Sequence, residues 1–229
     1  MAKIFLYAVA RQSDAAALER AKSLINTSHS IDGVHPMLSL MVPLADDPFG
    51  YVPGVSFERP SFVIEIAQPM GKPLEPAITL LQPQLTSLLE LLDRNKTQVL
   101  AGYHRAFKVT GKNQLIYHYL MQKKAGFRSV DYIDYYANNH YQFGIATPGI
   151  DYYQTYKDAE FTHELAQRWG VVAATAENVS EMHMNDVNEL LHGDGIAEVS
   201  RGALADEELF VDRPNSRMFT MQLIARRTL

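Results

Sequence analysis

Cysteine is absent from the 229-residue sequence, which excludes a disulfide framework, a thiolate metal site and a cysteine nucleophile together. Basic residues are sparse as well: Lys and Arg never stand more than two in a row, and the formal net charge is −5. A protein that binds a phosphate backbone needs a basic stripe, so we expect no nucleic-acid partner. A chain without thiols also fits the reducing cytoplasm, where we place the protein.

Long apolar runs and glycine-rich loops are missing too. The longest apolar run, residues 4–10, is far shorter than the roughly 20 residues that cross a bilayer. It is also too short for the apolar region of a signal peptide, so we interpret it as a buried strand and expect no membrane contact. No G-x-G-x-x-G, P-loop or G-x-S-x-G pattern occurs, which leaves nucleotide cofactors and serine hydrolysis without support.

The hydrophobic pattern of the first half predicts the element order β-α-β-β-α-β. One helix follows Ser13 as its N-cap, and the second is expected to begin near Pro83, because proline suits a first helical turn. Segment 43–60 is rich in Pro, Gly and Asp and is expected to be a loop. The four strands are predicted at 3–10, 34–42, 61–67 and 97–107.

The second half repeats this order. Ser129 is the expected N-cap of a helix that ends at Gly144, and a broken helical region begins at 185. An additional segment, 157–177, separates the second and third strands of this half. The strands are predicted at 115–122, 150–156, 178–184 and 217–225.

Two successive units with the same element order predict the fold. A β-α-β-β-α-β unit forms a four-stranded antiparallel sheet with both helices on one face, the ferredoxin-like arrangement. The other sheet face is apolar and must be covered. We therefore predict an α+β protein with tandem ferredoxin-like units, residues 1–109 and 113–229, whose sheets face each other as in a dimeric α+β barrel. Whether two chains associate further into a homodimer is left open.

The segment 131–144, DYIDYYANNHYQFG, holds four tyrosines, one phenylalanine and one histidine. As a regular helix it places Tyr136, His140 and Tyr141 on one stripe, with Tyr132 to the side. Two interpretations follow from this stripe. The rings are core filler with His140 at its edge, or they form a pocket wall on which His140 acts.

Two stretches of the second half resemble the EthD family, named for ethyl tert-butyl ether degradation. In 120–144 a basic strand end and a glycine precede a helix with an Asn-His pair near its end. Residues 205–219, ADEELFVDRPNSRMF, are similar to the family's D-E-x-x-F-V-D-R segment. The resemblance implies the ferredoxin-like fold and places the family's helix-terminal histidine at His140. Relatives with this barrel include isomerases, polyketide cyclases, monooxygenases and haem-binding enzymes. The first half carries neither motif, and 157–177 is an insertion, so no substrate is carried over.

Tyrosine is concentrated in the second half, where nine of the twelve tyrosines lie between residues 117 and 156. A dry core favours Leu, Ile and Val, because a buried phenol needs a hydrogen-bond partner. Tyrosines in such number suit a ligand cavity or, equally, a protein–protein interface. As residues that line a pocket for a small hydrophobic ligand we select Tyr117, Tyr119, Tyr141, Phe143 and Tyr152.

Three other patterns in the sequence contain residues that can bind metal, transfer protons or form ion pairs. The 163–167 segment, HELAQ, resembles the zinc motif H-E-x-x-H but has Gln where the second ligand belongs, so we predict a solvated helix and no metal. His183 and Glu181 share a strand face and form either an acid–base pair or a cross-strand contact. Asp212 and Arg213 are expected to form a salt-linked turn before the last strand.

Three hypotheses about function follow. The first is a cofactor-independent enzyme of the isomerase, cyclase or lyase type, acting on a small aromatic or polyketide-like compound, as in aromatic compound degradation. In it His140 is the acid or base, Tyr136 donates to a developing enolate or phenolate, and His183 is a further acid–base candidate. The second is a non-catalytic protein that binds such a compound for a partner enzyme. The third is a haem-dependent enzyme with a histidine ligand. The first predicts no cofactor.

Overall fold

Nine strands of the described residues form one sheet, and all of them except the short β7 close into an antiparallel barrel. The computed structural model describes residues 2–28, 35–49, 59–69 and 72–229. Around the barrel the strands follow the order β1-β3-β2-β9-β5-β8-β6-β4, and β4 pairs with β1 to close it. The strands are β1 (Ala2–Ala8), β2 (Met37–Pro43), β3 (Phe62–Gln68), β4 (Gln98–Lys108), β5 (Leu115–Met121), β6 (Asp151–Lys157), β7 (Val172–Ala173), β8 (Asn178–Met184) and β9 (Arg217–Thr228).

Each half of the barrel has the strand order of a ferredoxin-like sheet. The first half runs β4-β1-β3-β2, and the second runs β9-β5-β8-β6. The two sheets join through the pairs β2–β9 and β4–β6. The predicted fold class is therefore confirmed. The predicted unit boundary falls in the connection between β4 and β5 and stays a prediction.

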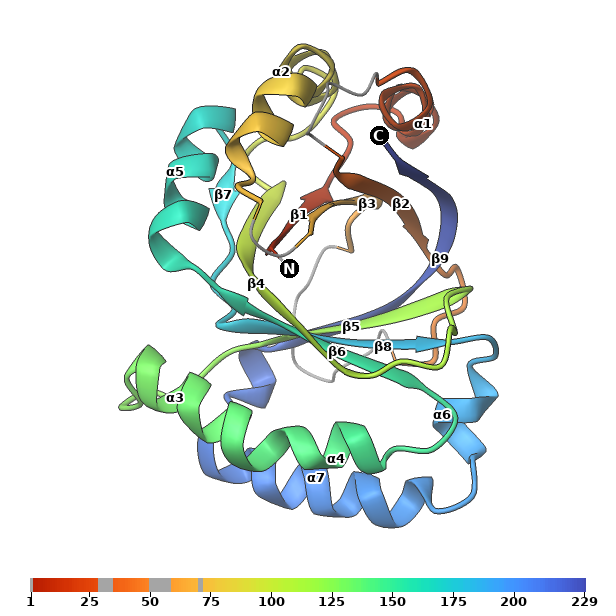
Figure 1. Ribbon diagram of the computed structural model, residues 1–229, viewed down its shortest axis with the longest axis vertical. Helices are drawn as coiled ribbons and strands as arrows, with labels where there is room; N and C mark the ends of the chain where they lie inside the picture. The colour runs from red at the N-terminus through yellow and green to blue at the C-terminus, as the bar shows by residue number, and fades with distance from the viewer. Residues whose placement is uncertain (1, 29–34, 50–58, 70–71) are drawn as a thin grey trace.

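Two helical layers flank the barrel on opposite sides (Figure 1). One layer covers the strands of the first half, and the other covers those of the second half. The first contains α1 (Asp14–Thr27), α2 (Glu75–Leu89) and α5 (Ala159–Trp169). The second contains α3 (Ser129–Tyr135), the π-helical turn η1 (Tyr136–His140), α4 (Tyr141–Ala146), α6 (Asn188–His192) and α7 (Ile196–Phe210), followed by the 3-10 turn η2 (Arg213–Asn215).

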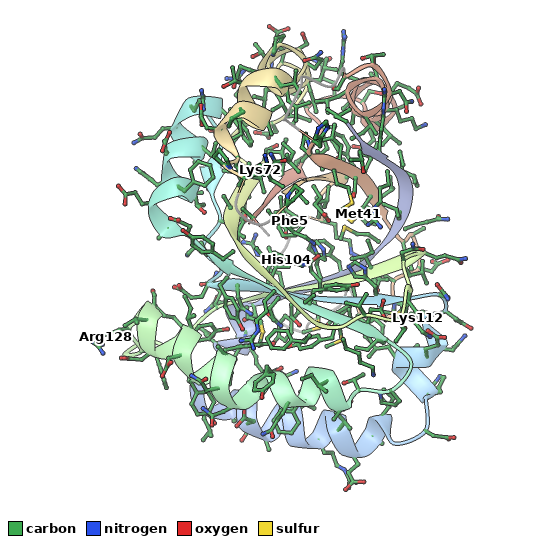
Figure 2. All side chains as sticks on the ribbon, in the orientation of Figure 1. Phe5, Met41, Lys72, His104, Lys112 and Arg128 are labelled. Atoms are coloured by element: carbon green, nitrogen blue, oxygen red, sulfur yellow. The ribbon has the colours of Figure 1, made fainter. Side chains whose placement is uncertain are left out.

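Most of the barrel strands are buried on both faces, although the C-terminal parts of β4 and β9 are largely exposed or half-buried. The barrel wall thus separates an inner core from two outer cores. The inner core is formed by side chains such as Phe5 and Met41, which Figure 2 shows inside the barrel. The outer core of the second half is rich in aromatic rings, among them Tyr132, Tyr136 and Phe210. Strand residues alternate between the two faces, so neighbouring residues of one strand belong to different cores.

The prediction for the start of α2 was wrong. The helix begins at Glu75, with Pro76 in its first turn, and Pro83 lies in the helix interior. Pro83 lacks an N–H, so one helical hydrogen bond is missing there. The helix continues because its apolar stripe is fully buried, including Leu81 and Leu85 on either side of the proline. Packing of such a stripe contributes more to a helix in a protein than local propensity does.

Both predicted ends of the aromatic helix were also wrong. Arg128, not Ser129, is the N-cap, and no side chain caps the first turn. At the other end the helix passes through Gly144 and stops before Thr147, whose backbone is extended. Gly144 has a packing role instead, because a Cβ at this position would lie 2.2 Å from Cζ of Tyr152. The glycine lets the helix approach β6 closely.

The additional segment 157–177 forms α5 and β7. One face of α5 packs into the outer core of the first half through Leu165, Ala166 and Trp169. His163 lies on its exposed face and bonds Gln167 at 2.9 Å, so HELAQ is on a helix with one solvated face. Residue 34 of a predicted strand and residues 50–58 of the predicted loop lie outside the described residues.

Candidate active site

A cavity lies between the outer face of β5, β6 and β8 and the helices η1, α4 and α7. Its empty volume is about 480 Å³, counted out to the open mouth. Apolar side chains make up most of the wall, and the polar groups converge from η1 and α7. A concave, mostly apolar site with a few convergent polar groups is the common form of a small-molecule site.

The π-helical turn η1 supplies two side chains to this cavity. The N–H of Tyr141 bonds the carbonyl of Tyr136, one residue further than in an α-helix. Tyr136 and His140 both face inward and are almost completely buried. Such single π turns often occur at functional sites. The wider turn also corrects the predicted stripe, because Tyr132 is fully buried instead of lying at its side.

His140 forms a dyad with Asp206, the acidic residue of α7 that faces it. Its Nδ1 lies 2.7 Å from Oδ2 of Asp206, so the neutral ring carries its proton on Nδ1 and donates it to the carboxylate. The other ring nitrogen, Nε2, then has a free lone pair. Nε2 lies 3.9 Å from Oε1 of Glu207 across the cavity. The next residue of the same helix therefore stands opposite the imidazole.

The two groups that face each other have shifted pKa values. Burial lowers the pKa of His140, and the hydrogen bond and charge of Asp206 oppose this only in part. Burial raises the pKa of Glu207 to about 7, although the nearby Arg213 guanidinium lowers it. Near neutral pH the imidazole is therefore largely unprotonated while a large share of Glu207 is protonated. This is the pairing of a base and an acid that proton transfer requires.

Glu207 is held by one of its oxygens and presents the other. Oε2 accepts a hydrogen bond from the Tyr119 hydroxyl at 3.2 Å and forms an ion pair with Nε of Arg213 at 3.0 Å. Oε1 is the oxygen that faces His140. Arg213 thus pairs with Glu207, and the predicted salt link to Asp212 is wrong. Asp212 instead accepts from the Asn215 side chain within its own turn.

A buried polar network supports the cavity floor. The Tyr136 and Tyr152 hydroxyls lie 2.8 Å apart, and the amide of Gln154 donates to both. Asn178 joins the network by donating to Gln154 at 2.6 Å, and it accepts from Tyr132 at 2.7 Å. One phenolic proton is used between the two hydroxyls. The second is left for Ser180, which lines the cavity, or for a ligand.

The structure brings five of the eight predicted site residues to this cavity: Tyr119, Tyr136, His140, Phe143 and Tyr152. Tyr117 is on the same sheet face but packs against Phe49, and Tyr141 packs against Phe107, both with ring centroids 5.2 Å apart. His183 lies on the other face of β8, inside the barrel, with Nε2 3.7 Å from Oε2 of Glu181. It cannot act together with His140 on one substrate.

Asp206 and Glu207 are the two acid–base residues of the cavity that were not selected from the sequence. A signal for them was present, since both belong to the 205–219 stretch that resembles the EthD segment. Their contacts with His140 span 66 and 67 residues along the chain, so they depend on how α7 packs against η1.

The described part of the chain contains neither a metal-binding cluster nor a membrane-spanning helix. No group of three or more His, Asp or Glu residues there is arranged to hold a metal ion. Among the described helices, none is long and apolar enough to cross a membrane.

Comparison with known proteins shows a fold but no sequence relative. No family model and no curated protein matches the sequence. Among solved structures, a candidate monooxygenase from Fusobacterium nucleatum has a TM-score of 0.61 at 8% identity and covers 99% of this chain and 93% of its own. An anthrone oxidase-like protein has a TM-score of 0.59 at 10% identity and covers 99% and 92%. A candidate chlorite dismutase has a TM-score of 0.53 at 11% identity and covers 98% and 94%.

These similarities extend over nearly the whole chain on both sides. Because the identities are so low, they establish the fold alone. The fold is of the dimeric α+β barrel type, with eight antiparallel strands closed into a barrel. The narrower resemblance to EthD stays a proposal.

Proposed function

We propose that this chain is an EthD-like, cofactor-independent enzyme that transfers protons on a small, largely apolar compound. The observation that carries this proposal is the His140–Asp206 dyad, whose free Nε2 faces Glu207 inside the cavity. A base and an acid on opposite sides of a bound molecule can remove a proton from one atom and add one to another.

His140 is the base in the proposed reaction. Its Nε2 takes a proton from a carbon next to a carbonyl, and Asp206 stabilises the imidazolium that forms. Asp206 also fixes the ring orientation, because Nδ1 is committed to its carboxylate. The electron pair of the broken C–H bond forms a carbon–carbon double bond, and negative charge moves to the carbonyl oxygen.

Glu207 is the acid in the same step. Protonated Oε1 donates to the oxygen on which charge develops, and an enol results. Return of the proton from His140 to a different carbon, with return of the enol proton to Glu207, completes an isomerisation. Tyr136 and Tyr152 offer one phenolic proton to the same region, which supports binding of an enolate or phenolate.

The cavity wall supports the proposed substrate class. Phe143, Leu190 and Val199 present carbon atoms to the cavity, and the polar groups gather at one place. This suits a flat aromatic or polyketide-like ketone with its oxygen toward Glu207. The name of the anthrone oxidase-like protein agrees with this class but belongs to that protein.

A haem-dependent reaction fits this site poorly. A metal on an imidazole lies about 2 Å from its nitrogen. Oε1 of Glu207 is only 3.9 Å from Nε2 of His140, so a carboxylate occupies the space that the macrocycle would need. We therefore derive no step through haem.

Proton–deuterium exchange tests the proposal. A panel of anthrone-type ketones and 1,3-diketones is incubated in D₂O, and loss of the acidic C–H signal is followed by proton NMR. The protein should accelerate exchange of at least one member, and His140→Gln should remove the acceleration. The matched control is His163→Gln, because His163 lies on the exposed face of α5, which belongs to the other helical layer.

The same panel of compounds distinguishes an enzyme from a non-catalytic binding protein. Tight binding by calorimetry without exchange would replace the enzyme proposal with the non-catalytic one. Exchange that persists in His140→Gln would assign the base to another residue and refute the role of the dyad. Cytoplasmic location and homodimer formation stay predictions.

A further inference from the structure

A second polar cluster lies inside the barrel, behind the wall that carries the His140 cavity. Its centre is Glu181, which has no exposed surface. Oε2 of Glu181 accepts a hydrogen bond from Nζ of Lys3 at 2.8 Å, and Oε1 accepts one from Thr155 at 3.0 Å. Three histidine rings surround this carboxylate: His104 at 3.3 Å, His183 at 3.7 Å and His118 at 3.9 Å.

Glu65 is the counterpart of Glu181 in the first half of the barrel. Glu65 is on β3 and pairs with Phe5 of β1, and Glu181 is on β8 and pairs with His118 of β5. Lys3 lies between the two carboxylates, with Nζ 3.4 Å from Oε1 of Glu65. Burial would lower the pKa of Lys3, but the charges of Glu181 and Glu65 outweigh it and raise the pKa. The ammonium therefore stays charged.

The cluster forms the floor of a cavity that opens at one end of the barrel. The empty volume of this cavity is about 610 Å³ out to its mouth. The rings of Tyr153 and His183 form one wall, with centroids 4.6 Å apart, and Met37 contributes from β2. His104, labelled in the barrel region of Figure 2, also lines this cavity.

Charges of opposite sign line this cavity at different depths. Glu65, Ser39 and Arg226 are direct neighbours across three adjacent strands. Neighbouring strands lie about 4.8 Å apart, so the Cα atoms of Glu65 and Arg226 are about 10 Å apart. Glu65 is buried at the floor, and Arg226 is exposed at the mouth, where its Nε donates to Ser39 at 3.1 Å. Lys112, also at the mouth, is paired with Glu189 at 2.6 Å.

Two buried polar atoms of the lining have no hydrogen bond to any described residue. They are Oε1 of Glu65 and Nε2 of His183. Glu65 is 1% exposed and His183 is 6% exposed, so water reaches neither freely. Oε1 of Glu65 has only the 3.4 Å ion pair with Lys3, and Nε2 of His183 has only the 3.7 Å contact with Glu181. Buried polar groups usually form hydrogen bonds as well, so both atoms have capacity for a further partner. An ionised carboxylate oxygen can accept hydrogen bonds but cannot donate them, so a further partner of Oε1 must be a donor.

We propose that this chamber binds a small zwitterion of the amino-acid class, with its ammonium group on Glu65 and its carboxylate on Arg226. Two buried carboxylates, Glu65 and Glu181, share the single Lys3 ammonium, so a ligand ammonium would balance the remaining negative charge. A planar guanidinium matches a carboxylate geometrically. The rings of Tyr153 and His183 contact the side chain, which favours an aromatic one.

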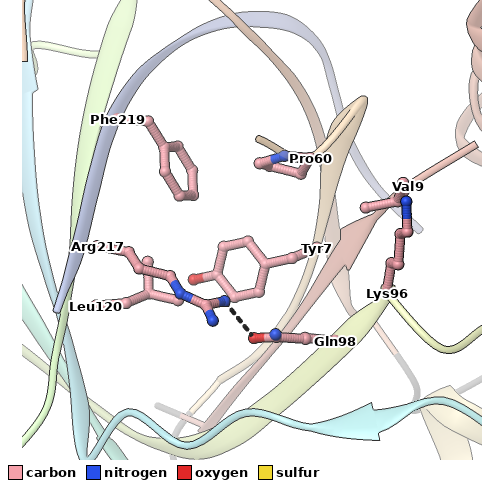
Figure 3. Close-up of a pocket in the computed structure, with 8 residues that line it drawn as sticks. All are labelled: Tyr7, Val9, Pro60, Lys96, Gln98, Leu120, Arg217 and Phe219. Atoms are coloured by element: carbon pink, nitrogen blue, oxygen red, sulfur yellow. Dashed lines mark hydrogen bonds between the residues drawn. The ribbon is translucent and has the colours of Figure 1, made fainter. Parts of the chain in front are cut away.

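The residues described at the opposite end of the barrel do not offer the same combination. Figure 3 shows that end, where Arg217 already bonds the side-chain oxygen of Gln98 at 3.1 Å. Tyr7 separates the two ends: its hydroxyl lies 3.3 Å from Nδ1 of His118, under the Glu181 carboxylate. The lumen is thus divided, and of the residues that the structure describes at its two ends, those at the Glu65 end present both charges to a ligand.

Calorimetric titration with three related compounds tests the proposal. L-Phenylalanine carries both charged groups, 2-phenylethylamine only the ammonium and 3-phenylpropionate only the carboxylate. L-Phenylalanine should bind at least about tenfold more tightly than either of the others, which corresponds to 1.4 kcal/mol. Glu65→Gln and Arg226→Gln should each reduce its affinity by at least about tenfold. His140→Gln should not change it, since that residue lies on the other side of the wall.

Several results would overturn the proposal. These are equal binding of the three compounds, wild-type affinity in either variant, or no heat from any amino acid up to millimolar concentration. Glu65→Gln removes a carboxylate from Lys3 and can fail to fold. In that case Arg226→Gln decides alone, because its exposed side chain can be replaced without disturbing the floor. Loss of binding in His140→Gln would place the ligand in the other cavity.

Discussion

Nδ1 of His140 lies 2.7 Å from Oδ2 of Asp206, on a helix that follows it by 66 residues. This contact fixes which imidazole nitrogen is free and directs it toward Glu207. Each of the predictions below depends on that geometry or on the packing that produces it.

Replacement of His140 by Gln should separate a functional role from a structural one. Gln can retain a hydrogen bond to Asp206 but cannot accept a proton near neutral pH. We expect the thermal midpoint to stay roughly unchanged while binding of an anthrone-type ketone weakens at least about tenfold, or 1.4 kcal/mol. Lower stability with unchanged binding would identify His140 as a core residue only.

Asp206→Asn should lower the pKa of His140 further. The carboxylate is the group that raises this pKa against the effect of burial, and Asn keeps an acceptor without the charge. NMR titration of the His140 ring should show the shift, and proton exchange should slow at least about tenfold. Tyr135→Phe is the control, because it removes the other hydrogen bond of Asp206 without touching His140. An unchanged titration would contradict the dyad.

Glu207→Gln should change how stability depends on pH. The folded-state pKa of Glu207 is about 7, raised from 4.5, so the folded protein binds a proton more tightly than the unfolded chain does. The stability linked to this proton is present below pH 4.5 and is lost as pH rises through 7. The loss amounts to about 3 kcal/mol at most.

The variant should therefore lose less stability than the wild type between pH 5 and 8, which thermal melts at each pH would show. Glu208→Gln, at an exposed position of the same helix, is the matched control and should follow the wild type. Parallel curves for Glu207→Gln and the wild type would mean that the buried carboxyl titrates normally.

Gly144→Ala should destabilise the protein although alanine favours helices. The added Cβ would lie 2.2 Å from the buried ring of Tyr152, and overpacking of this kind typically costs 1–3 kcal/mol. The gain in helix propensity, about 1 kcal/mol, offsets only part of it. Denaturant melts should show a net loss of about 1 kcal/mol. In a Tyr152→Ala background the same change should cost nothing, and an equal cost there would exclude the ring as the cause.

The fold could be predicted because its information is local. Short apolar runs bounded by polar or turn-forming residues define the strands. Two units with one element order then leave few ways to cover two bare sheet faces. The predicted helix ends were less accurate than the predicted fold. In the sequence, Pro83 is typical of a first helical turn. In the structure it lies inside α2, because the buried apolar stripe of this helix continues on both sides of it. In the sequence, Gly144 is typical of a helix end. In the structure it is explained by the Tyr152 ring of β6, which leaves no room for a Cβ at this position.

The site could be predicted only in part. Tyr136 and His140 were found because helix periodicity places both on one side, even though the π turn changes the spacing. Asp206 and Glu207 could not be assigned, because nothing local connects α7 with η1. The contact of Lys3 with Glu181 spans 178 residues and exists only after the barrel closes. Such charges carry no periodic signal, since one residue per strand is enough to build the cluster.

The pairing of one lysine with two matched glutamates has an evolutionary meaning. In a barrel assembled from two identical chains, every substitution appears twice, once in each half. Here Lys3 has Ile116 as its counterpart in β5, by the same register that matches Glu65 with Glu181. Because both halves are encoded in a single gene, each can mutate independently. One fold can thereby diversify into two unlike chambers without the constraint of symmetry.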